Sequence, residues 1–485
     1  MTRRLLRILL RIALFLGNAA LIVFVTIILA GAFAARHGPD LENWHTVRLN
    51  SEFRAGGEVK TLDEYLLNEQ RVFEELENKV NAHVDLGEHN ELNRFARGSL
   101  SFPEKNGRNW NRSERQVPGR IRGGILLLHG MTDSPYSLRH FARLFHKQGF
   151  YVLNLRMPGH GTAPSELASV TWRDWDAAVK LGAEEVSSRL EPGQPFYILG
   201  YSNGGSLAVK YTLDSLNDTA LRIPDHLFLI SPMLGVSGLA RFGKIYYWLG
   251  KLSFFEKAAW SDTLPEYDPF KYNSFPMNGA RQSRALTTEI ERQIRWMANS
   301  GTLNIMPPVL TFQSLVDSTV ITEAIVTRLY DRLPANGSEL VLFDVNRAGM
   351  LEFFVSPQHD RLLNRLAGSG VLDYTLTKVA NINGESRFVM ASTKPPHSSE
   401  FKNLVLGMQW PENFYSLSHV ALPFPPDDEV YGFEPAASEM PYPRIGRVQL
   451  VGENGALIFP ASLYTRARSN PFFDYVTRRL VEASD

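Results

Sequence analysis

The hydrophobic pattern of the chain begins with one long uncharged run. Residues 12–35 carry no charge, and only Asn18 and Thr26 among these 24 residues are polar. At about 1.5 Å per residue a helix of this length is roughly 36 Å long, enough to cross a bilayer core. Arginines gather ahead of the run, which predicts a cytoplasmic N-terminus and export of the rest. A signal peptide cleaved near residues 32–34 is the alternative, but its apolar stretch is shorter, about 7 to 15 residues, so residues 1–35 are expected to be an anchor.

Residues 36–120 are expected to form a helical and linker segment beside the main domain. Thr61-Leu62-Asp63-Glu64 has the form of a capping box, and apolar residues follow it at helical spacing. This pattern predicts an amphipathic helix over residues 61–84. Residues 104–122 are polar and rich in Asn, Arg and Gly, which predicts a surface loop.

From Gly123 onward, short apolar runs alternate with amphipathic stretches. Strands are predicted at 124–128, 150–155, 196–199, 227–230, 309–316 and 339–345. Helices between such strands indicate βαβ units, and therefore an α/β domain over residues 121–485 whose mostly parallel sheet has helices on both faces. Two stretches interrupt the alternation. They predict a cap inserted over about 233–308 and a second insertion over about 346–408, with a hairpin at Asn383-Gly384.

Composition narrows the chemistry. The chain has 51 basic and 51 acidic residues, so its formal net charge is zero and nucleic acid is not an expected partner. It contains no cysteine, which excludes disulfides, thiolate metal sites and a cysteine nucleophile. Histidines and carboxylates do not recur at metal-site spacing, so the sequence predicts neither a metal nor a cofactor.

The predicted strand at 196–199 runs into Gly200-Tyr201-Ser202-Asn203-Gly204 and then into a helix. G-x-S-x-G between a strand and a helix is the pattern of a nucleophile elbow, a strained turn that exposes the serine hydroxyl. The glycines are needed because strand and helix approach closely there. A glycine-rich turn that only packs the helix on the strand is the alternative. A phosphate-binding loop is disfavoured, since the P-loop lysine is missing.

Two turns upstream accompany the elbow. His129-Gly130-Met131-Thr132 ends one predicted strand, and the loop at residues 156–161 follows the next. Together the three motifs resemble the α/β-hydrolase superfamily, and most closely its monoacylglycerol lipase and lysophospholipase-type members. The resemblance covers roughly residues 121–345 and the region around His419. An oxyanion would be held by the backbone N–H of Asn203 and, as the resemblance implies, by that of Met131.

A serine nucleophile requires a base, and the base requires a carboxylate that fixes its tautomer. Asp317 follows the strand at 309–316, where the superfamily carries its acid, although an N-cap for the next helix is an alternative role. The superfamily's order of Ser, acid and His leaves His359, His397 and His419 as candidate bases. His359 falls in the first turn of a predicted helix, whereas His419 lies in a loop whose Ser-x-His-Val context resembles the family's base. His419 is therefore the expected base, which requires the second insertion to return the chain to the site.

These residues predict acyl transfer through a covalent intermediate on Ser202. Eleven of the 34 residues from Phe242 to Phe275 are aromatic, which predicts a cap with its own core, an acyl pocket or a lid that meets lipid. With the anchor, this favours a membrane-anchored serine hydrolase of carboxylic esters whose catalytic domain lies outside the cytoplasm. By the resemblance, the substrates are lipid-derived and similar to monoacylglycerols or lysophospholipids. An acyltransferase with the same triad and a non-catalytic scaffold on this fold are the alternatives.

Overall fold

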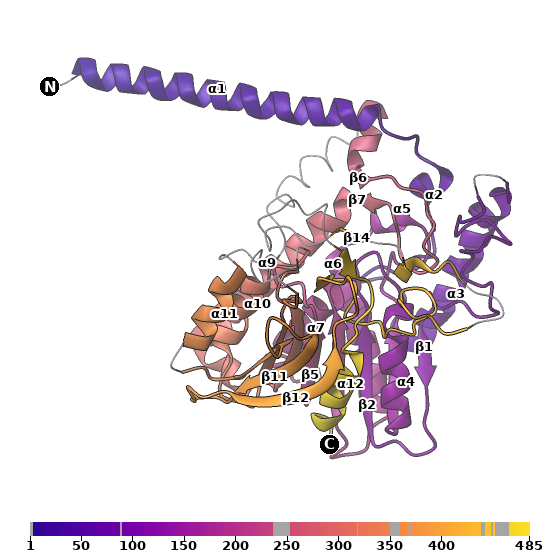
Figure 1. The fold of residues 1–485 in the computed structure, drawn as a ribbon. Helices are drawn as coiled ribbons and strands as arrows, with labels where there is room; N and C mark the ends of the chain where they lie inside the picture. The colour runs from indigo at the N-terminus through magenta and orange to yellow at the C-terminus, as the bar shows by residue number, and fades with distance from the viewer. Residues whose placement is uncertain are drawn as a thin grey trace.

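The computed structural model describes residues 3–87, 90–235, 253–317, 319–349, 359–368, 371–437, 442–447, 450–451 and 465–485. A ten-stranded sheet lies at its centre, in the order β1-β3-β2-β4-β5-β8-β9-β10-β11-β12 (Figure 1). The strands are β1 (Glu114–Gln116), β2 (Gly123–Leu128), β3 (Phe150–Leu155), β4 (Phe196–Tyr201), β5 (His226–Ile230), β8 (Val309–Ser314), β9 (Glu339–Phe343), β10 (Thr375–Asn381), β11 (Phe388–Lys394) and β12 (Lys402–Gln409). From β3 to β10 in this order all neighbours pair in parallel. The predicted α/β class with a mostly parallel sheet is confirmed.

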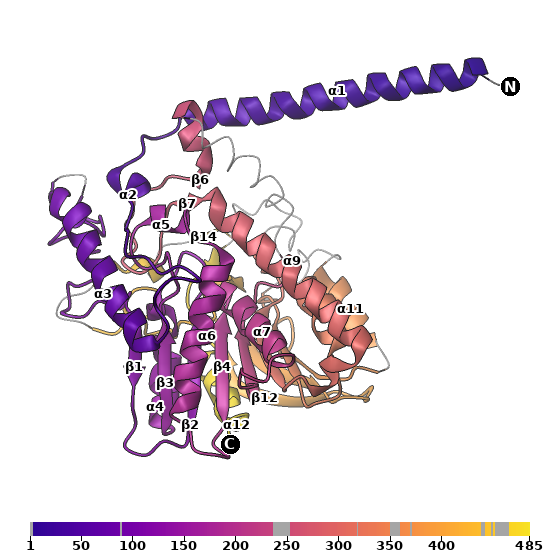
Figure 2. The same ribbon diagram turned by 180° about the vertical axis from the view of Figure 1, so that it is seen from behind.

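Helices cover both faces of the sheet. Figure 1 shows α4 (Arg139–Lys147) and α12 (Phe473–Glu482) in front of the strands, and Figure 2 shows α6 (Trp172–Ser188) and α7 (Asn203–Ser215) on the opposite face. Every residue of β2, β3 and β4 is therefore buried, and apolar side chains form a separate core on each face. Strands buried on both faces read as continuous apolar runs, which is why their positions could be predicted.

The N-terminal part contains three α-helices, α1 to α3, among its described residues. In α1 (Arg3–Arg36), the stretch Leu10–Gly31 has a mean hydropathy of 2.7 and is long and apolar enough to cross a membrane, a test that a signal sequence also passes. The helix projects away from the rest of the protein (Figure 1). Then come α2 (Asn43–Thr46) and α3 (Leu62–Lys79), and α3 begins with the predicted capping box of Thr61 and Glu64. The predicted surface loop at residues 104–122 is corrected at one point, because β1 pairs antiparallel with β3 as an edge strand.

The segment predicted as a second insertion, residues 346–408, contributes to the sheet. Its strand β10 pairs in parallel with β9, and β11 and β12 add two antiparallel strands at the edge. The predicted hairpin at Asn383-Gly384 joins β10 and β11. The ends of the excursion meet, since Asn346 N–H donates to the Tyr415 carbonyl over 2.7 Å. Residues 346–408 are thus an excursion that returns, but it extends the sheet rather than lying apart from it.

The predicted cap lies between β5 and β8. Its elements are η4 (Ser253–Ala259), β6 (Trp260–Asp262), β7 (Phe275–Pro276), α9 (Met277–Ser300) and η5 (Thr302–Ile305). Residues 236–252, with the first part of the aromatic-rich stretch, lie outside the described residues. Of the described aromatic residues, Phe270 stacks on Tyr136 at 3.8 Å between ring centroids, and the Trp260 side chain is buried against His45. These rings pack the cap against neighbouring segments.

The remaining elements are short. They are η1 (Asn81–His83), η2 (Pro135–Leu138), α5 (Pro164–Leu167), α10 (Thr322–Arg328), η6 (Tyr330–Arg332), α11 (His359–Gly368), β13 (Ser416–Leu417), η8 (Ile445–Arg447), β14 (Leu450–Val451) and β15 (Thr465–Ala467). β13, β15 and β14 form a second, three-stranded sheet. Its strand β13 directly precedes the loop that carries His419, and β14 and β15 follow that loop in the chain.

Candidate active site

The turn between β4 and α7 holds Ser202 in a strained conformation. Its φ of 54° and ψ of −115° lie in a region that residues with side chains rarely adopt. A Cβ at Gly204 would run into the Leu128 carbonyl, and one at Gly200 would run into the backbone of Gly204. The two glycines therefore permit the close approach of helix and strand. Ser202 directly follows β4, a central strand, and so lies where the carboxyl ends of the parallel strands meet.

The structure brings the three predicted triad residues together. His419 Nε2 lies 2.9 Å from Ser202 Oγ, and His419 Nδ1 lies 2.7 Å from Asp317 Oδ2. The other carboxylate oxygen of Asp317 accepts hydrogen bonds from the N–H groups of Thr319 (2.8 Å) and Val320 (2.9 Å). Asp317 is not the N-cap of the next helix, because α10 begins at Thr322 with Ile321 as its N-cap. The three side chains thus form one chain of hydrogen bonds.

The C-terminal part of the chain positions His419. The hydroxyl of Ser418 donates to the Ala467 carbonyl in β15 over 2.8 Å, and Ser314 Oγ at the end of β8 donates to the Leu417 carbonyl over 2.9 Å. The ring of Tyr201 lies 5.5 Å from the imidazole, nearly parallel to it. His419 is only 7% exposed, so its ring is held on several sides.

The two other candidate bases lie elsewhere in the fold. The His397 side chain is 55% exposed, and its Nε2 lies 3.7 Å from an oxygen of Asp373. His359 lies in α11, and the predicted start of this helix, at residues 356–357, lies outside the described residues.

The expected oxyanion donors, Met131 and Asn203, lie at the ends of β2 and β4. Asn203 is the first residue of α7, where backbone N–H groups have no partner within the helix. Among the described residues, neither of the two N–H groups donates to a backbone acceptor.

His129 holds the backbone next to Met131, a role that the sequence analysis missed. Its Nε2 accepts the Met157 N–H over 3.0 Å, so its proton lies on Nδ1 and is donated to the Gly130 carbonyl over 2.9 Å. Burial lowers the pKa of His129 to about 3, which keeps the imidazole neutral and this tautomer in place. The only sequence signal was a histidine directly after a buried strand.

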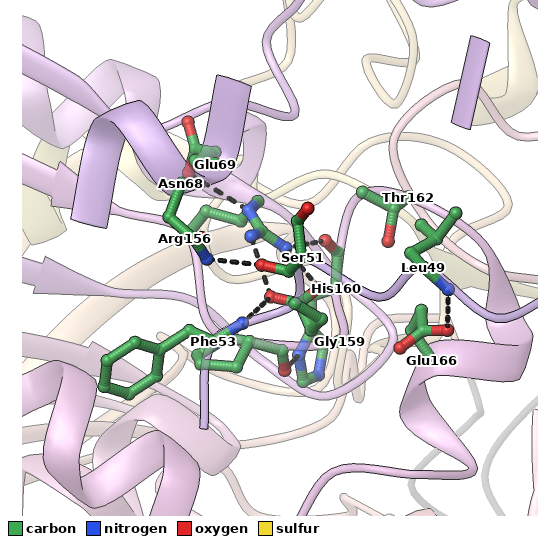
Figure 3. Close-up of polar contacts among 12 residues, drawn as sticks. Leu49, Ser51, Phe53, Asn68, Glu69, Arg156, Gly159, His160, Thr162 and Glu166 are labelled. Carbon is green, nitrogen blue, oxygen red and sulfur yellow. Dashed lines mark hydrogen bonds and ion pairs between the residues drawn. The ribbon is translucent and has the colours of Figure 1, made fainter. Parts of the chain in front are cut away.

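The loop at residues 156–161 is fixed from within and from the N-terminal segment. His160 Nδ1 lies 3.0 Å from the Pro158 carbonyl, and burial lowers the pKa of His160 to about 3. Arg156 forms a buried ion pair with Glu69 (Figure 3) and another with Glu52, and both glutamates belong to the N-terminal segment. The sequence analysis identified neither glutamate, because their spacing from Arg156 follows no local pattern. Among the described residues, no three metal-ligating side chains gather in one place.

Comparison with known proteins bears on the central part of the chain. Residues 119–344 match the family model described as serine aminopeptidase, S33. A thermostable monoacylglycerol lipase from Bacillus sp. (strain H-257) is 36% identical over 86 residues, which make up 18% of this chain and 33% of that lipase. This chain therefore matches about a third of the length of that relative.

Solved structures of similar fold include two lipolytic enzymes. A metagenome-derived lipolytic enzyme is 21% identical, with a TM-score of 0.37 over 48% of this chain and 87% of its own. A monoacylglycerol lipase from Paleococcus ferrophilus is 18% identical, with a TM-score of 0.36 over 48% of this chain and 89% of its own. Together with the parallel sheet and the serine elbow, the match over residues 119–344 makes this part of the chain similar to serine hydrolases of the α/β-hydrolase fold.

Proposed function

We propose that the chain hydrolyses carboxylic esters, with Ser202 as nucleophile, His419 as general base and acid, and Asp317 as the carboxylate that orients the base. The observation that carries the proposal is the hydrogen-bonded series from Ser202 Oγ through both nitrogens of His419 to Asp317, with distances of 2.9 and 2.7 Å. In this arrangement the base faces the nucleophile with one nitrogen and the carboxylate with the other.

The reaction proceeds in two halves. His419 Nε2 takes the proton of Ser202 as its oxygen attacks the ester carbonyl carbon, and the carbonyl oxygen becomes an anion held by the N–H groups of Met131 and Asn203. His419 then gives the proton to the leaving alcohol, which leaves an acyl group on Ser202. Water repeats the sequence, with His419 as base and then as acid, and releases the carboxylic acid. Removing one oxyanion donor from such a site typically costs about 100- to 1000-fold in rate.

The substrate class that we propose is an ester derived from lipid. Two observations support it, the 36% identity of 86 residues to a monoacylglycerol lipase and the apolar helix α1. We also propose that α1 is an uncleaved anchor, which places the catalytic domain beside a membrane and outside the cytoplasm. Membrane lipid is then both the anchoring environment and a source of substrate.

A fluorophosphonate probe tests the nucleophile. The probe is expected to label the full-length chain in detergent, and Ser202→Ala is expected to abolish labelling. Ser206→Ala is the matched control, since this serine is also buried and lies on the same helix but donates to the Met233 carbonyl. An unlabelled but folded wild type, or labelling that persists in Ser202→Ala, would overturn the proposal.

A panel of p-nitrophenyl esters with acyl chains of 2 to about 16 carbons, a range that spans short esters and lipids, tests the substrate class. We expect kcat/KM to rise with chain length. Equal values on short and long chains would contradict a lipid substrate and leave the esterase proposal intact. Products formed with glycerol present distinguish hydrolysis from acyl transfer, since a transferase would yield a new ester in place of free acid.

A further inference from the structure

The N-terminal segment reaches the loop at residues 156–161 through buried charges. Arg156 is 1% exposed, and its Nη2 lies 3.0 Å from Glu52 Oε1 while its Nε lies 3.0 Å from Glu69 Oε2. A third nitrogen, Nη1, donates over 2.9 Å to the carbonyl of His160, a residue that Figure 3 shows beside Arg156, and over 3.1 Å to Glu52 Oε2. Both glutamates lie before residue 119, where the family match begins. The N-terminal segment, which lies outside the matched region, therefore supplies the carboxylates that pair with the Arg156 guanidinium inside that region.

The same segment also holds the backbone of Arg156. Its N–H donates to Ser113 Oγ over 2.9 Å, and its carbonyl accepts the hydroxyl of Tyr65 over 2.6 Å. Ser113 Oγ in turn donates to Glu69 Oε2 over 2.8 Å. Tyr65 is 1% exposed and its ring packs edge-on against Phe53, so its hydroxyl has a fixed position. Both polar groups of this residue's backbone thus bind side chains of the N-terminal segment.

From Arg156 the hydrogen bonds continue to the expected oxyanion donor. The next N–H, that of Met157, donates to His129 Nε2 over 3.0 Å, and His129 Nδ1 donates to the Gly130 carbonyl over 2.9 Å. That carbonyl belongs to the same peptide unit as the Met131 N–H. Because this peptide is trans, its C=O and N–H point in opposite directions. Fixing the carbonyl toward His129 therefore fixes the direction of the Met131 N–H.

We propose that Tyr65 is a positioning residue for the oxyanion hole, acting through Arg156, Met157 and His129 on the Met131 N–H. This inference rests on the proposed esterase function, because the oxyanion exists only if Ser202 attacks a carbonyl. It assigns to the N-terminal segment a part in catalysis: the segment that follows the apolar helix α1 is needed to complete the site. The catalytic domain is then fully active only with this segment docked.

The expected effect lies in the transition state. If the peptide unit between Gly130 and Met131 turns or shifts by a fraction of an ångström, the surface that binds the substrate is unchanged. The hydrogen bond from the Met131 N–H to the developing anion, however, becomes weaker. We expect Tyr65→Phe to lower kcat about tenfold, less than complete loss of an oxyanion donor, and to leave KM within about twofold. Affinity for an alkyl boronic acid, which forms a tetrahedral adduct on the serine, is expected to fall in parallel with kcat.

The matched control is Tyr442→Phe. Its hydroxyl also donates to a carbonyl of the N-terminal segment, that of Pro103, over 3.0 Å, and its side chain is also buried. It has no hydrogen bond to the loop at residues 156–161. Both variants lose one buried hydrogen bond, so similar decreases in Tm are expected, whereas only Tyr65→Phe is expected to lose kcat and boronic acid affinity.

The experiment uses the full-length chain in detergent and a p-nitrophenyl ester. Equal kcat values for the two variants, or a Tyr65→Phe defect that resides in KM, would overturn the inference. If Tyr65→Phe does not fold, Ser113→Ala replaces it, since it removes the acceptor of the Arg156 N–H, and the same comparison decides. A wild type without esterase activity would instead refute the proposed function, so the two failures are distinguishable.

Discussion

The substitution Asp317→Asn is expected to abolish activity by changing the tautomer of His419. The two oxygens of Asp317 have different partners, since Oδ1 accepts two backbone N–H groups, those of Thr319 and Val320, whereas Oδ2 faces His419 Nδ1 and accepts the side-chain amide of Gln313 over 3.2 Å. An asparagine must turn its oxygen toward the two backbone donors, because an amide NH2 cannot accept a hydrogen bond. Its NH2 group then faces the imidazole, where the wild type has an acceptor.

The imidazole can bind that NH2 group only with an unprotonated Nδ1. Its proton then lies on Nε2, 2.9 Å from Ser202 Oγ, and this nitrogen can no longer take the proton of the nucleophile. In a serine triad the wrong tautomer lowers kcat by about 10⁴-fold. This corresponds to about 5.4 kcal/mol of lost transition-state stabilisation.

The assay is ester hydrolysis by the full-length chain, with Ser202→Ala as the floor and circular dichroism as the check of folding. His397→Gln is the control, because it alters a histidine that is 55% exposed and pairs with Asp373. It is expected to keep wild-type kcat, whereas His419→Gln is expected to fall to the floor. A folded Asp317→Asn variant with kcat within tenfold of the wild type would refute the reasoning.

Two further predictions concern stability and location. Burial lowers the pKa of His129 to about 3, so only the unfolded chain gains this proton as the pH falls below 6.5, and stability is lost over that window. Between pH 6.5 and 5 the lost stability amounts to about 1.6 kcal/mol. In urea unfolding, His129→Gln is therefore expected to lose about that much less stability over this pH range than the wild type; equal losses would contradict the prediction. If α1 is an anchor, carbonate washing leaves the full chain in membranes but releases a chain starting at His37. Since the chain has no cysteine, Lys402→Cys on the exposed β12 provides a single thiol. Its labelling by an impermeant maleimide in intact cells would support the proposed orientation, and protection would refute it.

The parts of the fold that could be predicted from sequence are those whose signal is local. Each of β2, β3 and β4 is six residues long and buried throughout, so a short apolar run between turns was sufficient. The signal of the serine elbow is also local. Gly200, Ser202 and Gly204 lie within five residues, and the close approach of strand and helix that requires the two glycines takes place at this one turn.

The parts that could not be predicted depend on contacts between distant segments. β12 is exposed at most positions, so it lacks the alternation of a half-buried strand, and only its pairing with β11 makes it part of the sheet. The ion pairs of Arg156 join residues 104 and 87 positions apart, to Glu52 and Glu69. Charged side chains are almost never fully buried unless paired, and a sequence does not show which of its many charges will find partners.

The distance of 102 residues between Asp317 and His419 was the main obstacle to assigning the base, and the structure explains why it is tolerated. The N–H and the side-chain amide of Asn346 donate to the carbonyls of Tyr415 and Phe414, over 2.7 and 2.9 Å, so the excursion begins and ends at one place. Each doubling of a loop's length adds only about 0.6 kcal/mol to the entropic cost of closing it, and pairing of β10 to β12 with the sheet opposes even that cost. Beyond the excursion, the position of His419 is set by the bond of Ser418 to β15 and by that of Leu417 to the end of β8. The separation from Asp317 therefore does not argue against His419 as the proposed base, because the residues directly before it fix its position.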